Sequence, residues 1–214
     1  ATAQRWYLRL KNPVDHPSAP LSAVAGRLVD SELSDKNATL TRWMNEVQMF
    51  LHGHPVNERR QNKGQPVINS LWLWGNGSLP QLAAPEPLEV WSDNPLASGL
   101  ALAGGYPAHP CPAHLETLFD ATQDGNHLVV LDALLPKVLC EDGEGWRSTL
   151  NTMENDWFSP LTVALGRQIK QLSLIAPTSY GELRWAAQGS DRWKFWRARR
   201  TLPSLAQELA EEKL

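Results

Sequence analysis

Two stretches of the chain show the apolar spacing of an amphipathic helix. Between residues 37 and 52 apolar side chains recur at intervals of three and four, and Asn37 or Thr39 can cap the start. From about 144 to 168 a second apolar stripe follows the same period, and Pro160 is expected to kink this helix or divide it. Two further helices are expected at 94–105 and 203–214.

Runs rich in β-branched, aromatic and other apolar residues predict strands between these helices. The runs at 127–135 and 171–177 are almost continuously apolar, so both are expected to be fully buried strands. Beyond residue 82 strands alternate with helices, which predicts an α/β fold with a largely parallel sheet and helices on both faces. The predicted strands are 4–10, 67–74, 88–91, 127–135, 171–177 and 181–187.

The composition narrows the class of protein. Of the 214 residues, 42% are hydrophobic and 20% are charged, which is typical of a globular chain and unlike a disordered one. The net charge of −3 gives no reason to expect a nucleic-acid or membrane surface, and no apolar run approaches the roughly 20 residues that span a bilayer. The start of the chain lacks the layout of a signal peptide, so a cytoplasmic protein is expected, with Cys111 and Cys140 as unlinked thiols.

The ten tryptophans are an unusual number for this length. An indole ring is large and mostly apolar, so many of these rings are expected to be buried or to lie at an interface. The segment 191–200, DRWKFWRARR, mixes aromatic and basic residues, a combination that can bind single-stranded nucleic acid. Its aromatic spacing also fits an amphipathic closing helix packed on the core, and the acidic net charge favours that interpretation.

Between His54 and Gly77 several unusual residues lie close together. His52 and His54 have too few neighbouring ligands for a metal site, so a surface or capping role is favoured for them. Glycines at positions 75 and 77 predict a tight turn without the spacing of a dinucleotide or phosphate-binding loop.

A polar cluster occupies the middle of the same stretch. Asn57, Arg59, Arg60 and Lys63 follow a helix directly, and Asn69 interrupts a predicted apolar strand. An arginine beside amide groups and glycine backbone suits a phosphate or a carboxylate. A solvated helix end, with an asparagine that holds a loop, explains the same residues equally well.

The sequence from Asn45 to Gly77 resembles a segment of the archaeal-type cofactor-independent phosphoglycerate mutases, of the alkaline phosphatase superfamily. The mutase pattern is NE…HPVN-x-x-R…G…N-x-x-L-x-R-G-x-G, and Trp74 stands here where the mutases carry arginine. Nearly the whole chain, 5–200, also resembles the RpfE-type regulatory proteins, a bacterial group. The matching residues are Asn45, Glu46, His54, Pro55, Val56, Asn57, Arg60, Gly64, Asn69, Gly75 and Gly77.

The resemblance implies a ligand site and the loss of catalysis. It assigns ligand contacts to Asn57, Arg60 and Asn69 foremost. The mutases use two metal ions held by Asp and His ligands and a serine nucleophile. In the region similar to one of their metal motifs, 137–146, this chain keeps Asp142 but has Trp146 near the place of a histidine. The implied ligand-binding residues are His54, Asn57, Arg60, Asn69, Gly75 and Gly77.

From the resemblance we expect a mutase-like substrate-binding segment at 1–82 and a degenerate α/β portion, similar to the alkaline phosphatase core, at 83–214. The expected role is regulatory or interaction-based, with a small phosphorylated or carboxylated ligand or a protein as partner, and with no catalytic residue, metal or cofactor. Neither a nucleic acid nor a membrane is expected as a partner. One alternative is an active phosphotransferase or phosphatase whose missing ligands come from an absent N-terminal segment or a second subunit. The other is a protein-binding scaffold with tryptophan-rich surfaces.

Overall fold

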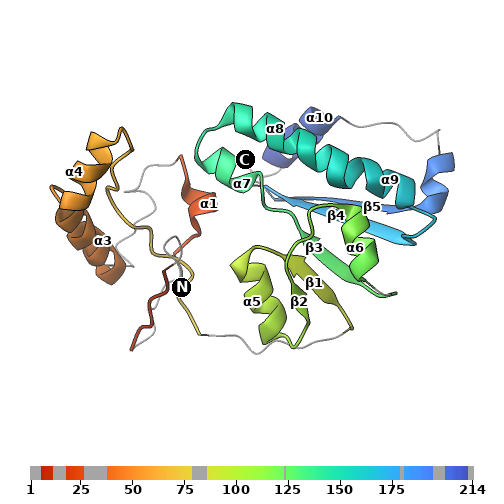
Figure 1. Ribbon diagram of the computed structural model, residues 1–214, viewed down its shortest axis with the longest axis horizontal. Coiled ribbons are helices and arrows are strands. Elements are labelled where there is room, and N and C mark those ends of the chain that lie inside the picture. The colour runs from red at the N-terminus through yellow and green to blue at the C-terminus, as the bar shows by residue number, and fades with distance from the viewer. Residues whose placement is uncertain are drawn as a thin grey trace. The chain divides into compact units, whose positions relative to one another are not determined.

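The computed structural model describes residues 6–11, 18–26, 38–78, 86–122, 124–178, 181–194 and 201–211. The chain divides into two compact units, Ala1–Gln81 and Leu82–Leu214 (Figure 1). Each unit is described by itself below.

The first unit is helical in its described part. It contains α1 (Leu21–Val24), α3 (Ala38–Leu51) and α4 (Pro55–Asn62). The helix predicted at 37–52 is confirmed as α3, which buries Leu40 and Met44 on one face. Asn37, one of its two expected caps, lies outside the described residues.

The strand predicted at 4–10 is wrong over the part that the structure describes. Residues 6–10 form no strand, and Trp6 and Tyr7 are 74% and 71% exposed. Alternating side chains produce a strand only where a second segment supplies backbone partners, and no described segment pairs with this one.

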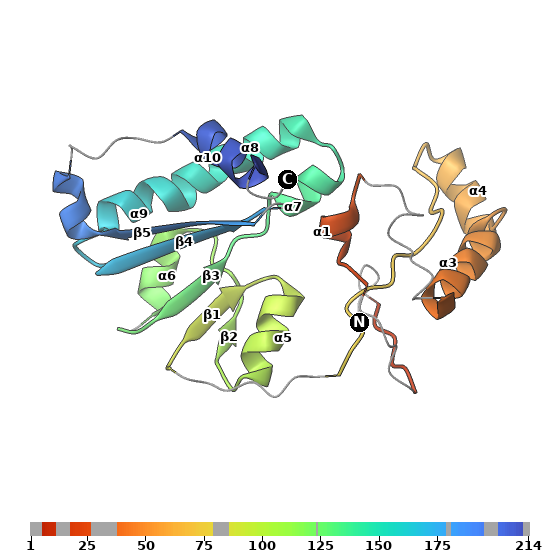
Figure 2. The ribbon, with the colours of Figure 1, turned by 180° about the vertical axis from the view of Figure 1, so that it is seen from behind.

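The second unit is built around a small parallel sheet. Its strands are β1 (Glu89–Ser92), β2 (Ala108–His109) and β3 (His127–Val130), in the order β2-β1-β3. The connections are α5 (Pro95–Ala103) and α6 (Leu115–Ala121). From β1 the chain passes through α5 to β2 on one side of β1. It then passes through α6 to β3 on the other side of β1. Right-handed crossovers in opposite directions place α5 and α6 on opposite faces of the sheet (Figure 2).

The core of this unit lies on the α6 face of the sheet. Trp91 of β1 packs with Leu115 and Leu118 of α6, and with Trp157 and Ala164 further along the chain. The neighbouring strand β3 is only half-buried, with Leu128 45% exposed. The expectation of a fully buried strand at 127–135 is therefore wrong, because the strand ends at Val130 and the next helix, α7, begins at Leu135.

The predicted long helix from 144 to 168 is divided. Helix α8 (Gly143–Met153) continues through a π-helical turn (Glu154–Phe158) into α9 (Ser159–Ala164), and the Ser159 N–H donates to the Glu154 carbonyl five residues back. Proline at position 160 has no N–H and would clash with the carbonyl four residues before it. The widened turn just before Pro160 avoids that clash, so the expected division is confirmed.

The last two strands form a separate hairpin. Strand β4 (Gln171–Pro177) pairs antiparallel with β5 (Glu182–Gln188). Both strands were expected and both exist, but Leu174 and Ile175 are more than a third exposed, so burial of β4 is wrong. The described fold is therefore α/β with a small parallel sheet, a two-stranded antiparallel sheet and several helices. The last of these is α10 (Leu202–Glu211), as the sequence predicts for the tail.

The tryptophans are distributed unevenly between core and surface. Trp91 and Trp157 are 6% and 5% exposed, whereas Trp193 is 78% exposed. The amphipathic helix expected at 191–200 is replaced, in its described part, by a short 3-10 turn, Gly189–Trp193. Cys111 and Cys140 are free thiols, as expected. Within the described residues, no helix combines the length and the apolar character needed to cross a bilayer.

Candidate functional site

The candidate segment begins at the N-terminus of α4, which His54 caps. The His54 Nδ1 accepts a hydrogen bond from the Val56 N–H at 3.2 Å, and Pro55 occupies the first turn, where its missing N–H costs nothing. The His54 ring also lies against the Phe50 ring, with centroids 5.0 Å apart. The histidine therefore has a local role at the junction of α3 and α4, as the capping interpretation predicts.

Asn57 lies in α4, and its side chain joins this helix to the backbone at Leu51 and at Ile68. Its side-chain amide donates to the carbonyls of Leu51 and Ile68, each at 2.9 Å, and its oxygen accepts from the Ile68 N–H at 2.9 Å. The residue is only 9% exposed. We call this arrangement the Asn57 clamp. Because both amide hydrogens are donated to backbone, Asn57 has no donor left for a ligand.

Arg60 is attached to the same loop at one end of its guanidinium. Its Nε donates to the Pro66 carbonyl at 2.7 Å, and its own carbonyl accepts from the Gln65 N–H at 2.9 Å. Gly64, at φ +65°, supplies the left-handed turn that reverses the chain between them. The two terminal nitrogens of Arg60 make no hydrogen bond with the described part of the chain.

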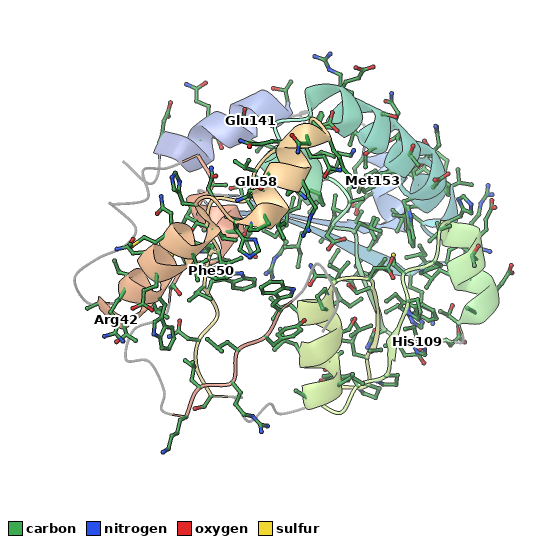
Figure 3. All side chains as sticks on the ribbon, turned by 60° about the vertical axis from the view of Figure 1, so that its left-hand side comes forward. Arg42, Phe50, Glu58, His109, Glu141 and Met153 are labelled. Atoms are coloured by element: carbon green, nitrogen blue, oxygen red, sulfur yellow. The ribbon has the colours of Figure 1, made fainter. Side chains whose placement is uncertain are left out.

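The cations around Arg60 face water. Arg59 and Lys63 are exposed, and Arg60 is half-buried. Glu58, labelled in Figure 3, is the only carboxylate within α4. Cations in the last turn of a helix also compensate its dipole, so part of this charge is explained by the helix itself. No carboxylate among the described residues forms an ion pair with Arg59, Arg60 or Lys63, so this surface charge can hold a small anion.

Residues 67–74 do not form the predicted strand. They run without regular structure, and Asn69 is exposed. No described segment supplies a ladder partner, so the apolar run is held by the Asn57 clamp and by single contacts. Asn69 is therefore not a buried polar group in need of partners. Its side chain is accessible to a ligand.

The glycine turn at the end of the segment is attached elsewhere. The Asn76 side-chain oxygen accepts from the Ser18 N–H at 3.1 Å, and the Ser18 hydroxyl lies 2.7 Å from the Leu73 carbonyl. The Trp72 indole N–H donates to the Ala19 carbonyl at 2.9 Å. Gly75 adopts φ +69°, a conformation that favours glycine. Gly77 follows, so this end of the segment is anchored to residues 18–19 and the other end to α3 and α4.

Asn76 and Ser18 were missed by sequence reasoning. The available signal was the asparagine between two glycines, because asparagine side chains commonly bond to backbone at tight turns. Ser18 had no signal of its own, because it is 58 positions from Asn76 in the sequence.

In the second unit, Asp142 has a structural role. Its carboxylate caps α8 by accepting from the Gly145 N–H at 2.8 Å, and it pairs with the Lys137 ammonium at 3.0 Å. The backbone hydrogen bond from Gly145 and then the Lys137 hydrogen bond hold the pKa of Asp142 below its usual value. Trp146 lies in the first turn of the same helix. The resemblance left Asp142 available as a ligand, and in the structure both of its carboxylate oxygens have hydrogen-bond partners within the chain.

No group of three His, Cys, Asp or Glu side chains converges as a metal site within the described ranges. His54 fits the favoured capping interpretation, because its side chain accepts the Val56 N–H, and His52 is exposed.

Comparison with known proteins gives two partial similarities. A probable 2,3-bisphosphoglycerate-independent phosphoglycerate mutase of Geobacter sulfurreducens is 42% identical over 45 residues, which are 21% of this chain and 11% of the relative. A 2,3-bisphosphoglycerate-independent phosphoglycerate mutase of Methanothrix thermoacetophila is 28% identical over 129 residues, or 56% of this chain and 32% of the relative. These matches support a distant relation to the cofactor-independent phosphoglycerate mutases. No family model matches the chain, and no solved structure matches it significantly.

The matched stretches span about a third or less of the curated relatives. The similarity therefore concerns parts of those proteins. What the candidate segment can do chemically rests on its own geometry: a locally clamped loop, an arginine held at one end, and further cations at the surface.

Proposed function

We propose that this protein is a regulatory relative of the phosphoglycerate mutases that has lost phosphoryl transfer and binds a small phosphorylated or carboxylated ligand beside α4. The observation that carries the proposal is the position of Arg60. Its Nε is fixed by the Pro66 carbonyl at 2.7 Å, while its terminal nitrogens have no bond to the described chain. A guanidinium held in this way loses less conformational freedom when it grips an oxyanion.

The surroundings of Arg60 favour an anion. Arg59 and Lys63 add positive charge on the same short helix and its end. Asn69 follows the clamped residue Ile68 directly and is exposed, so it can add a neutral donor close to the held loop. In this proposal Asn57 positions the loop, His54 caps the helix, and only Arg60 and Asn69 contact the ligand. Gly75 and Gly77 shape a separate turn.

The loss of catalysis is supported by Asp142 and Trp146. In the region that resembles a mutase metal motif, the retained carboxylate caps α8 and pairs with Lys137. Trp146 stands near the expected place of a histidine, and an indole cannot coordinate a metal ion. Trp74, 49% exposed, further removes an arginine that the mutases carry at that position.

Ligand binding is tested by thermal shift and calorimetry with 2-phosphoglycerate, 3-phosphoglycerate, phosphoenolpyruvate and inorganic phosphate. A ligand at about 100 times its Kd should stabilise the folded state by about 2.7 kcal/mol. Arg60→Ala should abolish the response. Arg42→Ala is the matched control, because Arg42 is an exposed arginine of α3 paired with Glu46 at 3.6 Å. The ligand site is refuted if none of the four compounds shifts the melting temperature. It is also refuted if a ligand shifts the melting temperatures of Arg60→Ala and Arg42→Ala equally.

Catalysis is tested separately on the full gene product with Mn²⁺ or Zn²⁺. Neither mutase nor phosphatase turnover is expected. Stoichiometric metal together with turnover would overturn the proposed loss of activity and favour the enzyme alternative, whether or not an anion binds beside Arg60.

A protein-binding role is a second candidate, supported by apolar side chains at the end of α3. Met49 is 78% exposed and Phe50 is 68% exposed. Figure 3 labels Phe50 on this helix. Large exposed apolar side chains that adjoin each other are common at protein interfaces. A pull-down with the full chain that gives a defined partner, lost in Phe50→Ser and retained in Thr39→Ser, would favour this candidate over the ligand site.

A further inference from the structure

The second unit, Leu82–Leu214, has a hollow between the loop after α9 and the 3-10 turn Gly189–Trp193. It is an open cavity of about 440 Å³, lined by Leu165, Gly166, Arg167, Gly189 and Trp193. Its volume falls in the range of ordinary small-molecule sites.

Gly166 and Gly189, which both line the hollow, bring two segments of backbone into direct contact. A Cβ placed on Gly166 would lie 2.6 Å from the Cα of Gly189, and a Cβ on Gly189 would lie 2.5 Å from the Cα of Gly166. Gly166 also adopts φ +81°, and its N–H donates to the Ile169 carbonyl at 2.7 Å. Glycine is therefore required at both positions, because a side chain on either one would collide with the backbone of the other segment.

The walls are an indole and a guanidinium. Trp193 ends the 3-10 turn and is 78% exposed, and Arg167 is exposed on the facing loop. The turn itself is fixed, because the Asp191 carboxylate accepts from the Gln188 N–H at 2.8 Å and also pairs with the Lys194 ammonium. No carboxylate of the described chain forms an ion pair with Arg167.

Trp193 is exposed, whereas the sequence pattern favours a buried ring at this position. The pattern predicts that the aromatic residues of 191–200 pack on the core, whereas Trp193 presents its ring to solvent. An exposed indole and an exposed arginine that line the same hollow suit a ligand with a flat aromatic ring and an anionic group. Stacking on the indole holds the ring, and the guanidinium can bind phosphate oxygens in pairs.

We propose that this hollow binds a nucleotide, with the base stacked on Trp193 and the phosphate on Arg167. The net charge of −3 provides no long-range attraction for a polyanion, which favours a free nucleotide over a long single strand. Both sources share the same chemistry, and the experiment separates them.

Binding of AMP, GMP, CMP and UMP to the full chain is measured by calorimetry, and binding of a fluorescent short oligothymidylate by anisotropy. Adenosine, which lacks the phosphate, and ribose 5-phosphate, which lacks the base, should each bind more weakly than AMP. Trp193→Ala should weaken nucleotide binding by about tenfold or more, and Trp193→Phe should retain most of it. Arg167→Gln should weaken AMP binding while leaving adenosine binding unchanged.

Trp6→Ala and Arg184→Gln serve as matched controls, because both residues are exposed and lie outside the hollow. Circular dichroism of every variant checks that it is folded. Preference for oligothymidylate over the mononucleotides, with the same variant pattern, would assign the site to a single strand. The proposal is overturned if no probe binds at millimolar concentration, if ribose 5-phosphate binds as well as AMP, or if Trp193→Ala and Arg167→Gln bind as the wild type does.

Discussion

Removal of the Asn57 side chain tests whether the candidate segment is a locally clamped structure. Asn57→Ala deletes two donors and one acceptor, whose hydrogen bonds to Leu51 and Ile68 all measure 2.9 Å. Each net hydrogen bond contributes about 1 kcal/mol, and water can reach part of the loop, so the expected loss is about 2–3 kcal/mol. For a unit of this size, such a loss lowers the melting temperature by on the order of 10 °C.

Hydrogen exchange followed by mass spectrometry is the appropriate assay, because a chain of two units need not unfold in one step. Peptides that cover the Ile68 amide should exchange about 30-fold faster or more in Asn57→Ala, since about 1.4 kcal/mol corresponds to a factor of ten. Asn62→Ala is the control, because Asn62 is an exposed asparagine at the end of the same helix. Unchanged exchange at Ile68, or an equal effect of both substitutions, would refute the clamp.

Two further predictions concern the second unit. Gly166→Ala should destabilise this unit by about 1–3 kcal/mol, because the new methyl group would lie 2.6 Å from the Gly189 backbone and φ at Gly166 is +81°. Gly99→Ala should stabilise it by about 0.5–1 kcal/mol, because Gly99 lies in the middle of α5 and its added methyl group has nothing within 4 Å. Thermal melts that rank these two variants in the opposite order would contradict the packing described. The pKa of Asp142 is lowered in the folded state, so its contribution is present above the unfolded value of about 3.8 and is lost as pH falls through the lower folded value. Urea titrations should therefore show Asp142→Ala less stable than wild type at pH 7, and the difference should shrink as the pH falls below about 4. A difference that stays constant or grows as the pH falls through this range would contradict the proposed contribution of the ionised Asp142.

Local sequence signals predicted the helices more reliably than the strands. The apolar stripe that predicted α3 depends on residues close in sequence. Helical hydrogen bonds are made within one segment, so a short stretch of sequence contains most of the information. Pro160 is a further example, because its clash lies four residues back.

The strands were harder because their hydrogen bonds need a partner. The runs at 4–10 and 67–74 have strand-like composition, yet no described segment pairs with either. By contrast β4 and β5 follow each other closely, and their antiparallel pairing is local enough for the sequence to indicate it. Burial was also overestimated, because an apolar run does not show whether a second layer covers it.

For the candidate site, the sequence by itself determined the residue types: a capping histidine, an asparagine and arginine on one short helix, and glycines at the turns. Tertiary structure decided their roles. It turned Asn57 inward onto two backbone segments, left Asn69 exposed, and tied Asn76 to Ser18 across 58 positions. It also engaged the carboxylate of Asp142 and exposed the ring of Trp193 beside Arg167. A residue type fixes which hydrogen bonds and contacts a side chain can make, but only the three-dimensional arrangement of distant segments decides which of them it makes.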